Sequence, residues 1–93
     1  MNYIKLNKDI NEVSINGKNI SLTNQEAALL EALMENPDTT LSRDSLLKDV
    51  WGYKSAGVTR TVDVHIQRLR RKIGTDMIET VHRCGYRLNL DPS

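Results

Sequence analysis

The sequence predicts an α+β domain in which a small antiparallel sheet precedes three helices and a β-hairpin ends the chain. Short β-branched segments with turn signals lie at both ends, and the middle carries apolar residues at helical spacing. A length of 93 residues suits one modest core, so we expect a single domain over residues 1–93. Its expected parts are the sheet at about 1–22, the helices within 24–73 and the hairpin at 77–90.

The N-terminal sheet is indicated by a turn signal between two similar segments. Asn16-Gly17 favours a tight turn because both residues accept positive φ angles. Residues 12–15 precede this turn and residues 19–22 follow it, and both mix β-branched with polar side chains. We therefore expect a hairpin or a small sheet here.

The first helix is predicted to begin at Asn24 and to end before Pro37. Thr23 and Glu26 have the spacing of a capping box, in which each side chain accepts a hydrogen bond from the other residue's backbone amide. Proline disfavours helical backbone at the residue before it, which places the end near Asn36. The expected inward side chains are Ala27, Leu30, Leu33 and Met34.

The second helix is expected to run from a cap at Ser42 to a stop at Gly52. Residues 52–59 have no periodicity and contain two glycines, so they predict a loop, and Thr59 would cap the third helix. The apolar residues of the second helix repeat at the spacing of one helix face: Leu46, Leu47, Val50 and Trp51. We expect all of them, including Trp51, to pack inward.

The third helix, residues 60–73, is the most informative stretch because it separates apolar from basic side chains. At roughly 100° per residue, an inward stripe falls within about 40° of Val62. Gly74 ends the helix. The inward stripe comprises Val62, Ile66, Leu69 and Ile73; the opposite face carries Arg60, Val64, Gln67, Arg68 and Arg71; one flank carries Thr61, His65 and Lys72.

The outward face of this helix holds groups that read DNA. Arginine forks bind phosphates and clasp guanine, Gln67 suits adenine, and Val64 suits a thymine methyl. A basic helix alone is more often a solvated surface, so the elements around it decide the interpretation.

A hairpin of residues 77–81 and 86–90 is predicted directly after the third helix, with the basic residues His82 and Arg83 in its connection, 82–85. This order describes a helix-turn-helix followed by a wing. In such a domain the third helix enters the major groove and the hairpin reaches an adjacent minor groove. We therefore expect binding to double-stranded DNA.

The charge distribution agrees with a localised binding surface. The net charge is only +1, yet residues 1–58 carry −2 and residues 59–87 carry +4. A specific basic patch is favoured over diffuse coating of nucleic acid. A single cysteine, no apolar stretch near the roughly 18 residues that span a bilayer and no targeting signal favour a cytoplasmic protein.

Four motifs follow one another along the chain: Leu22-Thr23 with Glu26, Leu29 and Leu30; Val50-Trp51-Gly52; Arg60-Thr-Val-Asp-Val-His-Ile66 with residues 68–73; and Thr80-Val81 with Gly85-Tyr-Arg-Leu88. Together they resemble the winged-helix effector domains of OmpR/PhoB-type two-component response regulators. The resemblance implies that the third helix is the recognition helix and that the loop before it contacts RNA polymerase. For that contact we expect Tyr53, Lys54 and Val58.

The resemblance also implies roles for single residues. Arg60, Thr61, Arg68, Arg70 and Arg71 match positions that hold phosphates or bases, and Val64 matches one that packs on a base. The helical wheel agrees except for Arg70, which lies at the edge of the core and has a salt bridge to an acidic neighbour as its alternative role.

The wing departs from the family pattern at its tip. Thr80 and Tyr86 match positions that touch the DNA backbone. His82 stands where many relatives carry an arginine for the minor groove, and Arg83 replaces a frequent glycine. Of these two, Arg83 is the better candidate for the minor groove because it is always charged.

The receiver domain that usually precedes such an effector domain is not in this sequence, and we favour an excised piece over a naturally short regulator. The chain is then expected to be a monomer alone and to occupy directly repeated half-sites as two copies.

Other functions have weaker support. Paired carboxylates and a phosphate-binding glycine loop are missing, so we expect no enzyme and no cofactor. Metal sensing through His82, Cys84 and His65 has too few soft ligands, so no metal is expected. Redox sensing by Cys84 beside Arg83 and His82 has similarly weak support. The alternative that stays open is a protein-interaction module whose basic face docks on an acidic partner.

Overall fold

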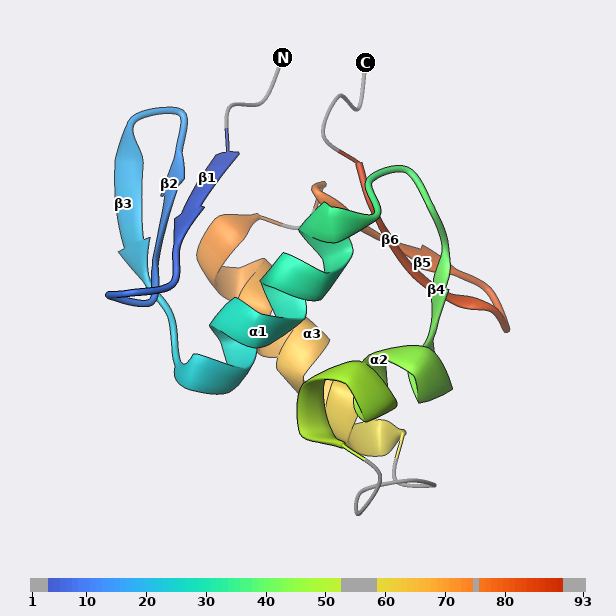
Figure 1. Ribbon diagram of the computed structural model, residues 1–93. Helices are drawn as coiled ribbons and strands as arrows, with labels where there is room; N and C mark the ends of the chain where they lie inside the picture. Colours follow the sequence, from blue (N-terminus) through green and yellow to red (C-terminus); the bar gives the residue numbers. More distant parts are fainter. Residues whose placement is uncertain (1–3, 53–58, 75, 90–93) are drawn as a thin grey trace.

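Three helices lie between two sheets in the computed structural model, which describes residues 4–52, 59–74 and 76–89 (Figure 1). The strands of these ranges are β1 (Ile4–Asn7), β2 (Glu12–Ile15), β3 (Lys18–Ser21), β4 (Leu41–Ser42), β5 (Ile78–Val81) and β6 (Gly85–Leu88). The helices are α1 (Asn24–Glu35), α2 (Arg43–Trp51) and α3 (Arg60–Ile73). The predicted α+β class and the predicted order of elements are confirmed.

The N-terminal sheet has the strand order β1-β2-β3, with both pairs antiparallel. Asn16 (φ 50°) and Gly17 (φ 88°) form the turn between β2 and β3, as the Asn-Gly signal predicted. With β1 as the third strand, the expected hairpin or small sheet is a three-stranded sheet. Val13 on β2 is fully buried and joins this sheet to the helical core.

The capping box of α1 forms as predicted. The Thr23 amide donates to Glu26 Oε1 at 2.9 Å, and the Glu26 amide donates to Thr23 Oγ1 at 3.2 Å. At α2, the Ser45 amide donates to Ser42 Oγ at 3.0 Å, which confirms Ser42 as the cap. None of the helices in the described ranges is long and apolar enough to cross a membrane.

Thr59 does not cap α3 through its side chain, so this prediction was wrong. Its backbone is already helical (φ −64°, ψ −18°), whereas a capping hydroxyl needs an extended residue to reach the free amides. The Thr59 carbonyl instead accepts from the Val62 amide at 3.0 Å. Gly74 ends the helix as expected, with a φ of 104°.

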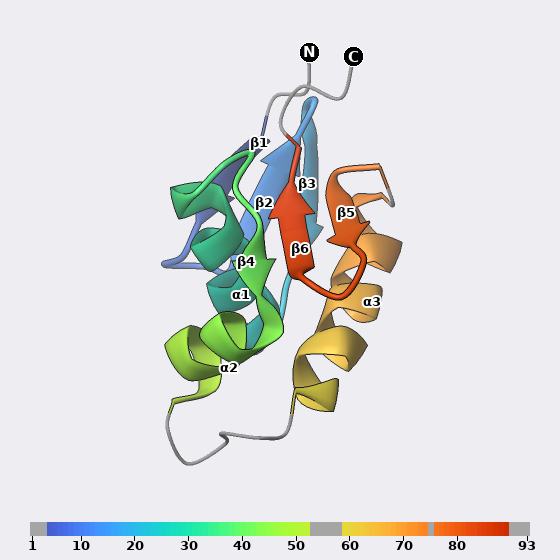
Figure 2. The same cartoon turned by 90° about the vertical axis from the view of Figure 1, so that its right-hand side faces the viewer.

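The second sheet has the order β4-β6-β5, and its first strand was not predicted (Figure 2). Leu41 and Ser42 pair with Tyr86 and Gly85, so the chain before α2 is fastened to the wing. The wing strands are shorter than expected: β5 begins at Ile78 rather than Met77, and β6 ends at Leu88. Gly85 belongs to β6 rather than to the connection.

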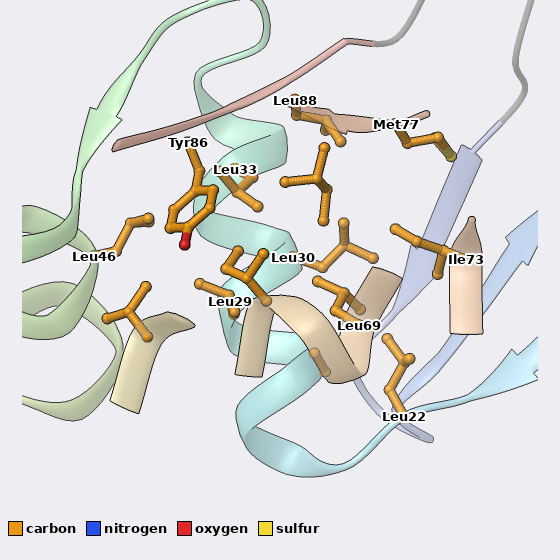
Figure 3. Close-up of a cluster of buried hydrophobic side chains, with 14 of the residues drawn as sticks. Leu22, Leu29, Leu30, Leu33, Leu46, Leu69, Ile73, Met77, Tyr86 and Leu88 are labelled. Carbon is orange, nitrogen blue, oxygen red and sulfur yellow. The ribbon is translucent and has the colours of Figure 1, made fainter. Parts of the chain in front are cut away.

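The core lies between α1, α3 and the two sheets (Figure 3). The predicted inward stripe of α3 is confirmed, since Val62, Ile66 and Leu69 are fully buried and Ile73 is nearly so. The sequence prediction for α1 missed Leu29, which is also fully buried. With its inner side fixed in this way, α3 turns its other faces to α2, to the wing and to solvent.

Candidate nucleic-acid interface

The outward face of α3 is exposed. Val64, at 42% exposure, is one of two large apolar residues of the described chain that are exposed. The remaining members of the face are exposed polar or charged residues, and the described residues offer them no hydrogen bond or ion pair: Arg60, Gln67, Arg68 and Arg71. Donors and one apolar group therefore point outward together, at the spacing the sequence predicted.

Of the predicted flank residues Thr61 and His65, His65 contacts α2. His65 Nδ1 lies 2.8 Å from the Thr61 carbonyl oxygen, where the protonated nitrogen donates. The imidazole also meets the Trp51 ring edge to face, with 4.8 Å between the ring centroids. Trp51 is half-buried against the core, which agrees with its predicted packing role. Both flank residues keep partial exposure, at the border of the outward face.

Lys72 is held inward by a buried carboxylate. Its Nζ lies 2.6 Å from Glu26 Oε1, and the Glu26 side chain is only 3% exposed. Burial alone would raise the pKa of Glu26, but hydrogen bonds from Lys72 and from the Thr23 backbone outweigh it and hold the pKa below its ordinary value. Lys72 is thus the predicted DNA contact of α3 that the structure supports least.

The side of α3 that faces the wing is built around Asp63. Its Oδ1 accepts hydrogen bonds from Arg43 Nε at 3.0 Å and from the Tyr86 hydroxyl at 2.6 Å, and its Oδ2 pairs with Arg43 Nη2. One carboxylate therefore joins the first residue of α2, the first turn of α3 and strand β6.

Arg70 forms a second link between α3 and the wing. Its guanidinium donates to the Ile78 carbonyl oxygen at 2.8 and 3.1 Å and to Thr80 Oγ1 at 2.6 Å. It also lies over the Tyr86 ring, 5.6 Å from the centroid. The partners are a carbonyl and a hydroxyl, so the acidic neighbour expected for Arg70 as an alternative is not found within the described residues.

The predicted wing residues separate into an exposed tip and a buried base. Thr80, His82 and Arg83 are exposed, and Arg83 adopts a φ of 62°, which explains why a residue without a side chain suits this position. Tyr86 is only 7% exposed, with its ring beside Leu33 and Leu46 (Figure 3). The Tyr86 ring packs in the core and its hydroxyl donates to Asp63, so this side chain has little free surface for the expected contact with the DNA backbone.

Two groups of sequence predictions remain without a structural counterpart. The expected polymerase contacts Tyr53, Lys54 and Val58 lie outside the described residues. Cys84 at the wing tip is exposed, and no group of three or more His, Cys, Asp or Glu residues able to hold a metal occurs in the part of the chain that is described.

Sequence reasoning missed Asp63 and Arg43 as members of this site. A signal existed for Asp63, because it precedes Arg70 by seven residues, so that the two lie only about 20° apart on a helix. Two polar residues at this spacing beside an apolar stripe indicate a helix side that faces another polar element. Nothing in the sequence near Arg43 reveals its partner, which lies 20 residues away.

We expect alkaline pH to destabilise the protein through Tyr86. Burial and the hydrogen bond to the Asp63 carboxylate raise the pKa of Tyr86 from 10.0 to about 12. A raised pKa in the folded state stabilises the protein below pH 10, and this stabilisation is lost as the pH rises toward about 12. Denaturant titrations should show that the free energy of unfolding falls less steeply over this window in Tyr86→Phe than in the wild type. Parallel pH profiles would contradict the assignment.

The fold and the exposed basic helix define the class of protein. Three helices, the third of which presents an exposed basic face, and a β-hairpin directly after them make a winged helix-turn-helix domain. The chain belongs to the family described as "Transcriptional regulatory protein, C terminal", which matches residues 17–88. The resemblance to OmpR/PhoB-type effector domains is confirmed, and the family is not one of enzymes.

Individual relatives support this assignment. The transcriptional regulatory protein CseB of Streptomyces coelicolor is 49% identical over 85 residues, which cover 91% of this chain and 36% of CseB. The DNA-binding domain of Bacillus subtilis CssR is 36% identical with a TM-score of 0.81, over 92% of this chain and 99% of that one. The Klebsiella pneumoniae RstA DNA-binding domain, solved in complex with the RstA box, is 29% identical with a TM-score of 0.80, over 95% of this chain and 92% of that one. CseB is therefore much longer than this chain, which spans only 36% of its length.

Proposed function

We propose that the chain binds double-stranded DNA in a sequence-dependent manner and thereby regulates transcription as the effector domain of a response regulator. The observation that carries the proposal is the outward face of α3, where Arg60, Gln67, Arg68 and Arg71 surround the exposed Val64 without partners among the described residues. A related domain, that of RstA, was solved in complex with a DNA element.

The proposed mechanism is binding, with α3 in the major groove. Val64 and Gln67 supply the apolar and amide contacts that distinguish bases, and Arg68 beside them supplies a fork for guanine. Arg60 and Arg71 at the ends of the face bind backbone phosphates. At the adjacent minor groove, Arg83 enters from the wing tip, and Thr80 and His82 border it.

Alanine at Arg68 and at Arg71 should have different consequences for DNA binding. Arg68→Ala is expected to weaken the free energy of binding to the preferred duplex by about 1–3 kcal/mol, because a base contact is lost. Its effect on binding to a scrambled duplex should be much smaller. Arg71→Ala should weaken both duplexes evenly and lower the slope of log affinity against log salt by about 1, because a phosphate contact is lost. Fluorescence anisotropy titrations at two salt concentrations measure both effects.

Lys8→Ala is the matched control because it removes one positive charge elsewhere. Lys8 is exposed and paired with Glu31 at 2.9 Å, on the side of the protein where β1 ends. Lys8→Ala should leave the affinity for both duplexes nearly unchanged. If Arg68→Ala and Arg71→Ala lowered the affinity of both duplexes by the same factor, the division between base and phosphate contacts would be refuted.

Several further properties follow as proposals from the resemblance. We propose that two copies occupy directly repeated half-sites and that RNA polymerase contacts Tyr53, Lys54 and Val58. Because the chain spans only part of the length of its curated relatives, a receiver domain would control these events in the whole protein. We place that protein in the cytoplasm.

The rival proposal, a basic face that docks on an acidic protein, is not favoured. A purely electrostatic dock has no use for the exposed Val64 or for Gln67 among the arginines. Selection of a defined DNA sequence by the isolated chain would separate the two proposals.

A further inference from the structure

The carboxylate of Asp63 is placed where a DNA-binding surface would not ordinarily accept a negative charge. It lies in the first turn of α3, one position before Val64 of the outward face. It also lines a hollow of about 270 Å³ together with Arg43 and the wing residues from Thr80 to Tyr86. An unpaired carboxylate here would repel the phosphates of a bound duplex. We therefore expect Asp63 to have a role that offsets the repulsion between its carboxylate and the phosphates.

The contacts of Asp63 indicate what that function is. Three elements meet on this one side chain: Arg43 of α2 binds both carboxylate oxygens, and Tyr86 of β6 donates to one of them. The forked contact of an arginine with a carboxylate fixes the orientation of both groups, and charge-assisted hydrogen bonds are stronger than neutral ones. The Tyr86 side of the junction is buried, so that solvent weakens it little.

Asp63 and Arg70 attach α3 to the wing at two positions along the helix axis. Asp63 binds the hydroxyl of Tyr86, and Arg70 lies over the ring of the same tyrosine while it also binds strand β5. Two attachments about two turns apart fix the direction of a helix, whereas one would allow it to swing. The Asp63 attachment directly precedes Val64, one of the residues proposed to contact bases.

We infer that Asp63 is a positioning residue for DNA recognition: by fixing α3 against α2 and the wing, its carboxylate gives the protein its selectivity between DNA sequences. This inference rests on the proposed function. A base contact depends on placement of the side chain to within a fraction of an ångström, whereas attraction to phosphates tolerates small displacements. Loosening the junction therefore reduces discrimination more than it reduces affinity for DNA in general.

The test is Asp63→Asn, which keeps the size of the side chain and removes its charge. Affinities are measured for the duplex selected from a random pool and for its scrambled version, at a temperature where circular dichroism shows the variant fully folded. We expect the affinity for the selected duplex to fall on the order of tenfold, comparable to the loss of one good base contact. The affinity for the scrambled duplex should stay unchanged or rise, because a negative charge is lost and Arg43 is released.

Two further variants separate positioning from charge and from folding. Glu31→Gln gives the same change of net charge on α1, in the surface hollow it shares with Ala28 and Asp49, and should leave the ratio of the two affinities unchanged. Tyr86→Phe removes only the hydroxyl that joins Asp63 to β6 and leaves the charge unaltered. It should lower the ratio in the same direction by a smaller factor, and it serves as the test if Asp63→Asn does not fold.

The outcomes distinguish this inference from the proposed function. If the wild type itself does not discriminate between duplexes, the proposed function fails. If the wild type discriminates and Asp63→Asn keeps the same ratio, or binds both duplexes more tightly by an equal factor, the positioning role of Asp63 is overturned while the function stands.

Discussion

Replacing Gly85 with alanine is expected to lower the free energy of unfolding by about 3 kcal/mol or more, through backbone strain and overpacking together. A Cβ atom at Gly85 would lie 1.9 Å from the carbonyl oxygen of Leu41 and 2.9 Å from the Cα of Ser42. Both neighbours belong to the backbone of β4 and cannot rotate away. The φ of 153° adds strain for any side chain. Thermal and denaturant unfolding followed by circular dichroism would measure the loss.

Gly17→Ala is the matched control for this prediction. Gly17 also has a positive φ, 88°, but a Cβ atom there would meet nothing within 4 Å. Its substitution therefore carries only the conformational cost, about 1 kcal/mol. Equal losses at the two glycines would show that the pairing of β4 with β6 does not need the close approach at Gly85.

Leu69→Ala is expected to lower the free energy of unfolding by about 2–5 kcal/mol, the range for removal of a fully buried leucine from a packed core. Leu69 is 0% exposed and lies on the inward stripe of α3 between Arg68 and Arg70. Shortening it leaves a cavity between α3 and α1. Chemical denaturation at neutral pH gives the value directly.

The outward face of the same helix supplies the control. Val64→Ala removes an exposed side chain, and alanine favours helix more than valine does, so stability should change by less than about 0.5 kcal/mol. Binding to the selected duplex should weaken nonetheless, because the contact to a base is lost. A destabilisation by Val64→Ala equal to that of Leu69→Ala would refute the assignment of an inward and an outward face to α3.

The elements that could be predicted from the sequence are those whose signals are local. The cap at Thr23 with Glu26, the turn at Asn16 and the apolar stripe of α3 each depend on residues within a few positions of one another. The outward face of α3 follows from the same periodicity, so it could be predicted before the fold was known.

The features that could not be predicted depend on residues far apart in the chain. Strand β4 has two residues, too few to show alternation, and exists because β6 offers a partner more than 40 residues later. Tyr86 was assigned to the DNA backbone from the family resemblance alone, because its hydrogen bond to Asp63 joins residues 23 positions apart. The ion pair of Glu26 with Lys72 joins residues 46 positions apart.

Four of the nine polar side chains of α3 bind other parts of the protein rather than its proposed ligand, and the structure is what separates these two groups. Asp63 and Arg70 hold the wing, while His65 and Lys72 hold α2 and α1. Charge alone would have assigned Lys72 and Arg70 to DNA. The residues left for base reading are those without partners in the described chain, a shorter set than the basic composition of the helix suggests.

Selection from a random duplex pool, followed by sequencing of the bound fraction, tests the central claim most directly. The binding of the winning duplex is then titrated at two salt concentrations. Enrichment of a short, directly repeated motif, with affinity that falls steeply as salt rises, is the predicted result. Absence of any enriched sequence, with only weak salt-sensitive binding to every duplex, would contradict sequence-dependent recognition by the outward face of α3.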